Sequence, residues 1–475
     1  MCVSSAFAQA TGQINGVVAD NSGGVVPGVT VTAVEASTGI ARETVTGANG
    51  RYSFPSLRPT TYEIRAELTG FRTVRQTDVV LAANQNLTLN ITLELGDLSE
   101  TVTVAGDAAT VDVTTATIAE VVDSKRIVEL PLNGRDAARL SMLVSGMVVT
   151  SVDQESGKTI PGALRLSTNG TESRQASFRL DGTNHTDSYF QQNQPFPFPD
   201  ALQEFSIQTS NYSAAQGASA GAVVNAVTRS GTNNFHGGIF GYARDRTFNS
   251  KNFFAADRDF LKRKQYGGYA GGPIARNRMF FFAGWQGTQI QNVGGTLNQT
   301  IPTTAMRAGD FSAVPVQLRD PNGGVFPGNQ IPVSRFDPAA VNVMKYMPNV
   351  AGGNGALVQV PRRIGQDDNQ VIVKIDNQLN DNNQIGVRYF FDHFTNDPTF
   401  EEGNLLTYRN PTLGSRQRIQ NVVGSWQRTL TSTLLNEFRV GFNKFASSRY
   451  PPNGVPSMRD LGVRLPIYPS LPSIS

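Results

Sequence analysis

Alternation of apolar and polar positions dominates the last third of the chain and predicts long β-strands there. In residues 371–379 the apolar side chains Val373 and Ile375 fall on one face, while Lys374 and Asp376 fall on the other. After an Asn/Asp turn at 380–383 the alternation resumes through residues 385–392, and it recurs at 438–443. Such strands are typical of a transmembrane barrel, with lipid on one side and the lumen on the other. A soluble sandwich gives the same alternation, so the pattern alone leaves both architectures open.

Shorter alternating segments fill residues 11–96. Strands are predicted at 13–20, 29–35, 40–46, 62–68 and 87–95, separated by turn clusters rich in Gly, Asn and Ser. Many short strands at regular spacing predict a small all-β sandwich.

The region between these two parts has a mixed pattern. Residues 136–144 carry apolar positions at helical spacing, and short strands are predicted at 163–167, 177–180 and 204–209. The proline-rich segment 195–199 predicts a rigid loop. Residues 222–228 alternate again before a turn at 230–233, which predicts one more strand.

Composition narrows the class of protein. Charged residues make up 17% of the 475 positions, below the roughly 25% of ordinary soluble proteins, and glycine is abundant with 46 residues. Mean hydropathy is −0.25, and we find no apolar run of about 18 residues, so helical membrane spans are not expected. A net charge of +3, spread along the chain, gives no footprint for nucleic acid.

Candidate chemistry is sparse, and we predict no catalytic residue, metal site or cofactor. Ser156–Thr159 resembles the end of a phosphate-binding loop, but Val152 stands where that motif needs its first glycine. His185, His236 and His393 lie far apart and are expected to be polar residues of loops or rims.

The first ten residues look like a targeting remnant. Cys2, the one cysteine, excludes an intrachain disulfide. An A-x-A cleavage pattern at Ala6–Ala8 predicts a truncated secretory signal over residues 1–10. A plain disordered tail is the alternative.

Several segments together resemble TonB-dependent outer-membrane receptors of the Oar-like type. AGAVVNAVTRSGTNNFHG, residues 220–237, resembles the end of the plug and the first barrel strand of this family. The segments RMFFFAGWQG and SFRLDGTNHTDSYF resemble its early barrel strands and a plug turn, and GQINGVVADNSGG resembles a carboxypeptidase-regulatory-like domain. The resemblance implies that five residues form a structural motif of the plug: Asp181, Gly182, Gly221, Asn225 and Gly231.

This resemblance implies a mainly β protein with five segments. They are a truncated signal peptide (1–10), a regulatory-like β-sandwich (11–96), a linker (97–107), an α/β plug domain (108–231) and a partial outer-membrane β-barrel (232–475). Large plugged barrels have about 22 strands of about ten residues, on the order of 220 residues before any loop is counted. Much of the last segment is Pro/Gly/Asn-rich loop, so we expect an N-terminal fragment with a truncated barrel.

The linker carries ETVTVA, which resembles a TonB box: Glu100, Thr101, Val102, Thr103, Val104 and Ala105. A β-prone segment kept free by flanking Gly-Asp pairs can add as a strand to a partner's sheet edge. We therefore expect it to be extended and unpaired. The alternative makes it the last strand of the sandwich or a plain linker.

The function implied by the resemblance is active transport of a scarce or bulky nutrient across the bacterial outer membrane. The implied partners are the TonB energy-transducing complex, outer-membrane lipid and an extracellular substrate that the sequence does not name. The sandwich and plug would face the periplasm. An outer-membrane adhesin or scaffold, and a soluble multi-domain β protein that binds glycans, are the alternatives.

Overall fold

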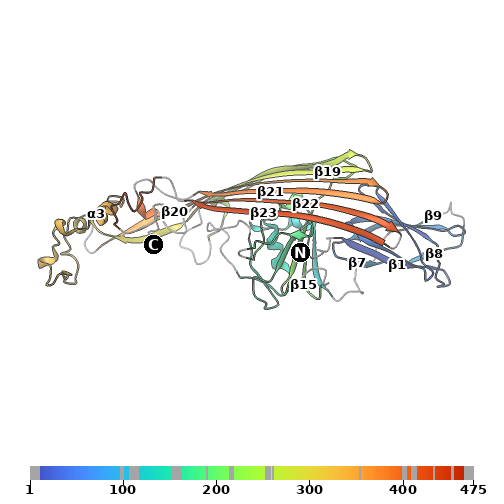
Figure 1. Cartoon of the computed structure of the whole chain (residues 1–475), viewed down its shortest axis with the longest axis horizontal. Helices are drawn as coiled ribbons and strands as arrows, with labels where there is room; N and C mark the ends of the chain where they lie inside the picture. The colour runs from blue at the N-terminus through green and yellow to red at the C-terminus, as the bar shows by residue number, and fades with distance from the viewer. Residues whose placement is uncertain are drawn as a thin grey trace.

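A computed structural model describes most of the chain and shows a mainly β protein (Figure 1). The described residues are 11–96, 101–105, 117–150, 163–188, 191–212, 219–251, 258, 261–351, 355–397, 404–407, 414–431, 434–450 and 454–464. The predicted signal peptide, Glu100 and the phosphate-loop-like segment lie outside them. We distinguish a sandwich (residues 11–105), a middle domain (117–228) and a long sheet (236–450).

The sandwich consists of two β-sheets that enclose an apolar core. One sheet has the order β4 (Arg51–Leu57), β1 (Gly12–Asp20), β7 (Asn86–Thr88), with β8 (Ile91–Leu93) also on β1. The other has the order β3 (Ala41–Val45), β2 (Thr30–Glu35), β5 (Thr60–Glu67), β6 (Thr73–Leu81), β9 (Thr101–Ala105). Ile14 and Tyr52 from the first sheet join Val31 and Ile64 from the second in one buried cluster. The predicted all-β sandwich is confirmed.

Two sandwich strands were missed by the pattern. β4 contains Pro55, and β6 has a polar run from Arg75 to Asp78 that interrupts the alternation. The segment 87–95, predicted as one strand, forms β7 and β8, which pair with successive parts of β1.

The middle domain is built on a five-stranded sheet. Its order is β10 (Ile118–Asp123), β15 (Leu202–Ser210), β16 (Val223–Thr228), β13 (Ser177–Leu180), β14 (Thr183–Asn184). Helix α1 (Ser124–Glu129), the 3-10 helices η1 (Asn133–Arg135), η2 (Ala137–Leu143) and η3 (Pro199–Ala201), and the pair β11 (Met147–Val149) with β12 (Leu166–Thr168) surround it. The helix predicted at 136–144 is therefore a 3-10 helix, while β10 and α1 were not predicted.

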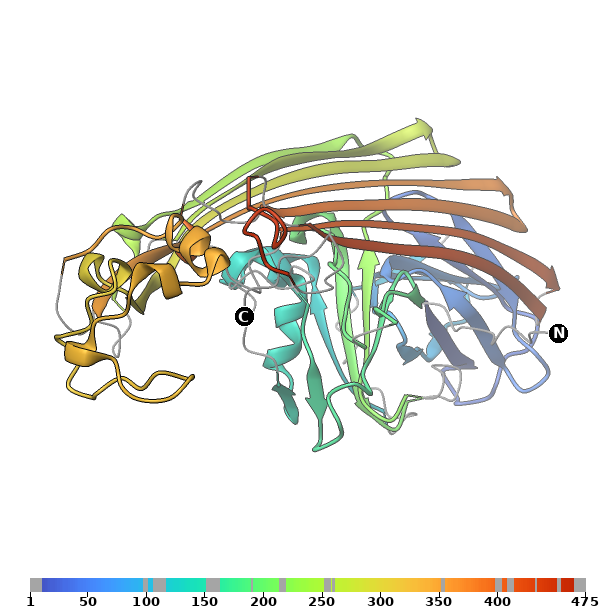
Figure 2. The ribbon, with the colours of Figure 1, turned by 60° about the vertical axis from the view of Figure 1, so that its left-hand side comes forward.

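The long sheet is an antiparallel meander of seven strands in chain order. They are β17 (His236–Arg244), β18 (Lys262–Ala275), β19 (Met279–Ile301), β20 (Ala356–Asn380), β21 (Asn383–Asp397), β22 (Gly414–Thr431) and β23 (Leu434–Tyr450). The sheet curves over the middle domain (Figure 2). Phe282, Ile372 and Phe390 from its concave face complete the core of the middle domain.

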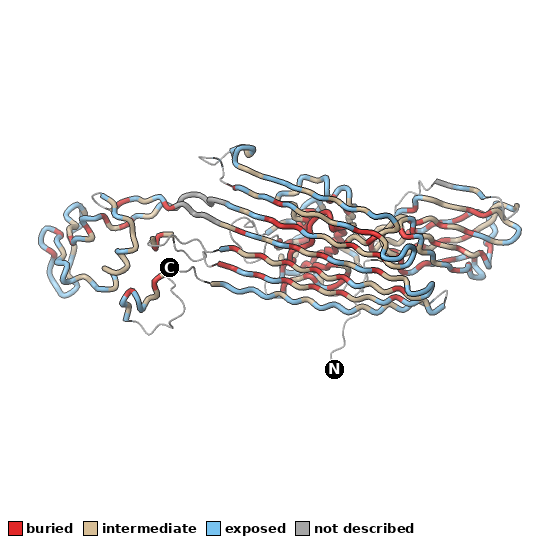
Figure 3. Tube along the Cα trace, turned by 90° about the horizontal axis from the view of Figure 1, so that it is seen from above, coloured by how far each residue is buried: buried red, intermediate tan, exposed pale blue. Residues whose placement is uncertain are grey.

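The two faces of the long sheet agree with the predicted alternation. Val373 and Ile375 are exposed on the outer face, whereas Lys374 reaches the middle domain and Asp376 is buried. On β23, Phe438 and Val440 are exposed, and Arg439 between them points inward to Asp181. Buried residues of the sheet concentrate where it covers the middle domain (Figure 3).

Short helices decorate the connections of the long sheet. Between β19 and β20 lie α2 (Thr304–Arg307), η6 (Pro327–Asn329), η7 (Val333–Arg335) and α3 (Pro338–Met344), at the end of the molecule opposite the sandwich (Figure 1). The helices η5 (Arg246–Phe248) and η8 (Leu405–Thr407) follow β17 and β21.

Candidate functional site

Asp181 fastens the middle domain to the long sheet. It occupies the turn between β13 and β14 with φ of 49°, a left-handed conformation that Asp tolerates better than most residues. Its carboxylate accepts hydrogen bonds from the Thr228 amide at 2.8 Å and the Thr228 hydroxyl at 2.9 Å, and forms an ion pair with Arg388 Nε at 2.9 Å. Burial raises the pKa of Asp181, but Lys374, Arg388 and the Thr228 bonds outweigh it and lower the pKa to about 2. The carboxylate therefore stays charged near neutral pH.

Further polar contacts surround this ion pair. Arg388 Nη1 donates to Asn421 Oδ1 at 2.6 Å and Arg388 Nη2 donates to the Leu180 carbonyl at 3.2 Å. Lys374 Nζ donates to the Thr228 carbonyl at 3.1 Å. Two strands of the long sheet, β20 and β21, thus contact the edge of the middle domain, and Asn421 on β22 holds the Arg388 side chain.

The structure brings three of the five motif residues together. The Gly182 amide, at φ of 76°, donates to Asn225 Oδ1 at 3.1 Å, directly beside Asp181. Gly221 and Gly231 lie apart from this group, each where backbones approach closely. A Cβ atom at Gly221 would lie 2.8 Å from the Gln175 carbonyl carbon, and one at Gly231 would lie 2.3 Å from the Phe281 carbonyl oxygen.

His185 is a core residue and not the loop or rim residue that the sequence suggested. It is fully buried, its Nε2 atom lies 2.8 Å from the Pro195 carbonyl oxygen, and its ring contacts those of Phe196 and Phe390. Burial lowers its pKa to about 3, so the ring is neutral. The proline-rich segment 195–199 folds inward and supplies Phe196 and Phe198 to the same core.

The segment that resembles a TonB box is extended, as predicted, but the prediction that it is unpaired is wrong. Thr101–Ala105 forms β9, which pairs in parallel with β6 from Thr73↔Thr101 to Thr77↔Ala105. It is the edge strand of its sheet, so one side of its backbone has no strand beside it within the described residues. The β-branched side chains that favour an extended backbone also favour this pairing.

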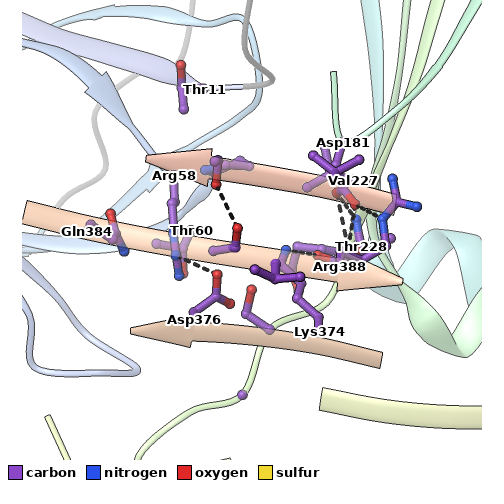
Figure 4. A pocket seen from close by; sticks show the side chains of 18 of the residues that line it. Thr11, Arg58, Thr60, Asp181, Val227, Thr228, Lys374, Asp376, Gln384 and Arg388 are labelled. Atoms are coloured by element: carbon purple, nitrogen blue, oxygen red, sulfur yellow. Dashed lines mark hydrogen bonds and ion pairs between the residues drawn. The ribbon is translucent and has the colours of Figure 1, made fainter. Parts of the chain in front are cut away.

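A cavity of about 240 Å³ lies where the sandwich, the middle domain and the long sheet meet (Figure 4). Its wall is strongly charged, with contributions from all three units: Glu35, Arg58, Asp181, Lys374, Asp376, Arg388 and Arg439. Sequence alternation placed Lys374, Asp376 and Arg388 on one face of their strands. It could not show that Arg58, from the sandwich, joins them.

A smaller cavity of about 110 Å³ lies between the middle domain and strands β18 to β21. Beside it, Arg135 pairs with Asp200 and lies over the Tyr242 ring at 4.0 Å and the Phe240 ring at 4.6 Å. Asp136, also on its wall, is half-buried, and the loss of water around its carboxyl raises the pKa of this group to about 6. Sequence reasoning missed these residues because Arg135 and Asp200 are distant in the chain.

The described residues contain neither a metal-ligand cluster nor a helix suited to cross a membrane. In that part of the chain no three His, Cys, Asp or Glu side chains form a group that could hold a metal ion. No helix among the described residues is long and apolar enough to cross a membrane.

Comparison with known families decides the class of the chain. Residues 13–94 match the carboxypeptidase regulatory-like domain, and residues 227–475, more than half of the chain, match the outer membrane beta barrel domain. The chain belongs to the outer membrane beta barrel domain family. This family places the chain in the outer membrane, with the exposed apolar face of the long sheet available to lipid.

Individual relatives of this outer membrane beta barrel chain are transporters and receptors. The chain is 29% identical to the TonB-dependent transporter Oar of Myxococcus xanthus over 297 aligned residues. The aligned region covers 59% of this chain and 27% of Oar. The chain thus spans about a quarter of the length of this relative. Among solved structures, the outer membrane transporter YddB of Escherichia coli has a TM-score of 0.42 at 11% identity, over 68% of this chain and 38% of that one. A variant of the ferric enterobactin receptor PfeA of Pseudomonas aeruginosa has a TM-score of 0.42 at 12% identity, over 70% of this chain and 41% of the receptor chain.

Proposed function

We propose that this chain is part of an active transport receptor that takes up a scarce or bulky nutrient across the outer membrane, driven by the TonB complex. The middle domain would act as the plug, and the sandwich would face the periplasm. The likeness to the TonB-dependent transporter Oar supports this proposal.

One observation carries the proposal. The middle domain lies on the concave face of a long sheet whose convex face is apolar, the position of a plug in a lipid-embedded barrel (Figure 2). Polar contacts such as Asp181–Arg388 and Lys374–Thr228 fasten its edge. Polar contacts can be exchanged for water when a domain shifts, so they suit a plug that must move.

The residues Glu100, Thr101, Val102, Thr103, Val104 and Ala105 are the proposed contact for TonB. β9 already pairs with β6, and its other edge is open to strand addition. TonB would either extend the sandwich sheet at this edge or replace β6 as the partner of β9. Main-chain hydrogen bonds would supply most of the affinity in both cases.

The test is uptake by cells that produce the full-length receptor. Because the cargo is unidentified, the probes are three panels: ferric chelates, oligosaccharides and peptides. We expect accumulation of a member of one panel that requires both the receptor and TonB. Binding at the surface without TonB-dependent accumulation of any probe would favour the adhesin or scaffold instead. The outer-membrane location already excludes the soluble glycan-binding protein.

A further inference from the structure

The sandwich is attached to the long sheet through a charged contact. Arg58, next to the start of β5, reaches into the large cavity, and its Nη2 atom lies 2.7 Å from Asp376 Oδ1 on β20 (Figure 4). The Asp376 side chain is 5% exposed and that of Arg58 24%, so the ion pair is largely removed from water. A single unpaired charge left at this depth would be costly, which favours keeping the two groups together.

Three more hydrogen bonds join the sandwich to β21 and β22. Arg42 Nη2 on β3 donates to Gln384 Oε1 at 3.0 Å and to the Gln427 side chain. Gln427 Nε2 donates to the Ser56 carbonyl at 3.1 Å. Gln384 and Gln427 lie opposite each other on the neighbouring strands β21 and β22. The sandwich therefore contacts adjacent positions of the long sheet along a single row that runs across the strands.

The sandwich also touches the middle domain and the turn that follows it. The Ala83 amide donates to Glu204 at 2.9 Å, and the Asn233 amide donates to the Ser37 carbonyl at 3.0 Å. With these contacts the sandwich closes one side of the cavity that contains Asp181 and Arg388. It therefore covers the place where the middle domain is fastened.

The contact between the sandwich and the middle domain is polar, and the two units share almost no buried apolar side chains. The apolar cores of the sandwich and of the middle domain are separate clusters. Among the described residues, the buried apolar cluster that joins the two units consists of Ala83 and Val227 alone. A polar interface with little apolar area resembles a transient interface between domains and not a permanent one.

We propose that the sandwich is a detachable cover of the long sheet and the middle domain, with Arg58 and Asp376 as its latch. Docked, it covers one side of the charged cavity; undocked, it leaves that side open to the surrounding solvent as well. Its link to transport rests on the proposed function. β9 belongs to the sandwich sheet, and the middle domain begins only at residue 117. A pulling force applied to residues 101–105 would therefore act on the sandwich before it acts on the middle domain.

The experiment measures access to the cavity in the purified full-length receptor in detergent. Ser425, a cavity-lining residue on β22, is replaced by cysteine in a background whose other cysteines, Cys2 included, are replaced by serine. The probe is a maleimide attached to a polymer too large for a cavity of about 240 Å³. Its reaction with Ser425→Cys should be faster when the sandwich has left, so the labelling rate rises with the undocked fraction.

Latch variants should raise that fraction. We expect Arg58→Gln and Asp376→Asn each to speed labelling by about tenfold or more, the effect of losing a charge-assisted hydrogen bond. The charge-swapped pair Arg58→Asp with Asp376→Arg should return the rate toward that of the parent. Arg72→Gln, which removes a half-exposed ion pair with Glu94 on the same sandwich, should leave the rate unchanged.

Parent-like rates in both single variants would overturn the proposal. Equal acceleration by Arg72→Gln, or no recovery in the swapped pair, would also overturn it, because the effect would then come from general loosening. The labelling needs neither TonB nor a substrate. A failure of the uptake test would therefore leave this result standing, and the two proposals fail separately.

Discussion

Arg388 and Asp181 are 207 positions apart in the chain, yet the Nε and Oδ2 atoms of these residues lie 2.9 Å apart. The Arg388 side chain is 2% exposed and that of Asp181 14%, so the pair joins β21 to the middle domain out of contact with bulk water. Each charge depends on the other, because an isolated charge is strongly disfavoured in such surroundings.

Replacing one partner should therefore loosen the middle domain. We expect Asp181→Asn to lower the free energy of detaching this domain by about 3–5 kcal/mol, the usual effect of leaving a buried charge unpaired. Denaturant titration of the full-length receptor, followed by protease sensitivity of the middle domain, measures this change. The matched control is Glu172→Gln. Glu172 forms an ion pair with Arg174, with Nε and Oε1 3.9 Å apart, and both side chains are well exposed. That control should change the free energy by less than about 0.5 kcal/mol. Equal effects in both variants would show that the Asp181–Arg388 ion pair does not hold the middle domain to the long sheet.

Glu204 should make stability fall as the pH rises toward neutral. Burial raises the pKa of this carboxyl to about 7, against the hydrogen bond from the Ala83 amide, which lowers it. The folded protein holds a proton that the unfolded chain releases near pH 4.5, so the free energy of unfolding decreases between about pH 4.5 and pH 7. Glu204→Gln should flatten this dependence and keep the acceptor for Ala83. Thermal melts across this pH range test it, and an unchanged slope would contradict the assignment.

Val102 tests strand addition at β9. Val102→Pro removes a backbone donor, so we expect it to abolish both binding of the periplasmic domain of TonB and TonB-dependent uptake. Val102→Thr should preserve both, because main-chain bonds carry the affinity. Neither change should affect substrate binding at the cell surface. Normal uptake by the proline variant would remove this segment from the mechanism.

The sandwich should fold alone, and β9 should add to its stability. Its two sheets share one core, and β9 contributes five register pairs with β6. We expect polypeptides of residues 11–96 and 11–105 both to unfold cooperatively. The longer one should be more stable by roughly 1 kcal/mol, measured by denaturant titration with circular dichroism. Equal stability would indicate that β9 does not pair with β6 in solution.

Glu63 should make the isolated sandwich sensitive to acid. The hydrogen bond from Arg75, together with Arg65 and against partial burial, lowers the pKa of Glu63 to about 2. The stabilisation is complete above about pH 4.5 and is lost as the pH falls toward 2. Glu63→Gln should reduce the loss of stability over this interval. A parent-like acid transition in the variant would show that the two arginines do not stabilise the carboxylate.

The sequence by itself determined which residues share a face. Alternation assigned Val373 and Ile375 to the outside and Lys374 and Asp376 to the inside, since successive side chains of a strand point to opposite faces. It also predicted the sandwich and, by resemblance, the family to which the chain belongs. These properties are local or repeat along the chain.

Only the tertiary structure decided which of these residues meet. Arg58 pairs with Asp376 across 318 positions, and no local pattern distinguishes that arginine from its neighbours. The residues next to His185 in the sequence are polar and suggest a loop. His185 is nevertheless buried, because segment 195–199 turns into the core and packs against it. The Thr/Val run at 101–105 is equally suited to a free strand and to a paired one. Its partner β6 settles the choice, because hydrogen bonds between strands depend on which backbone the fold brings alongside.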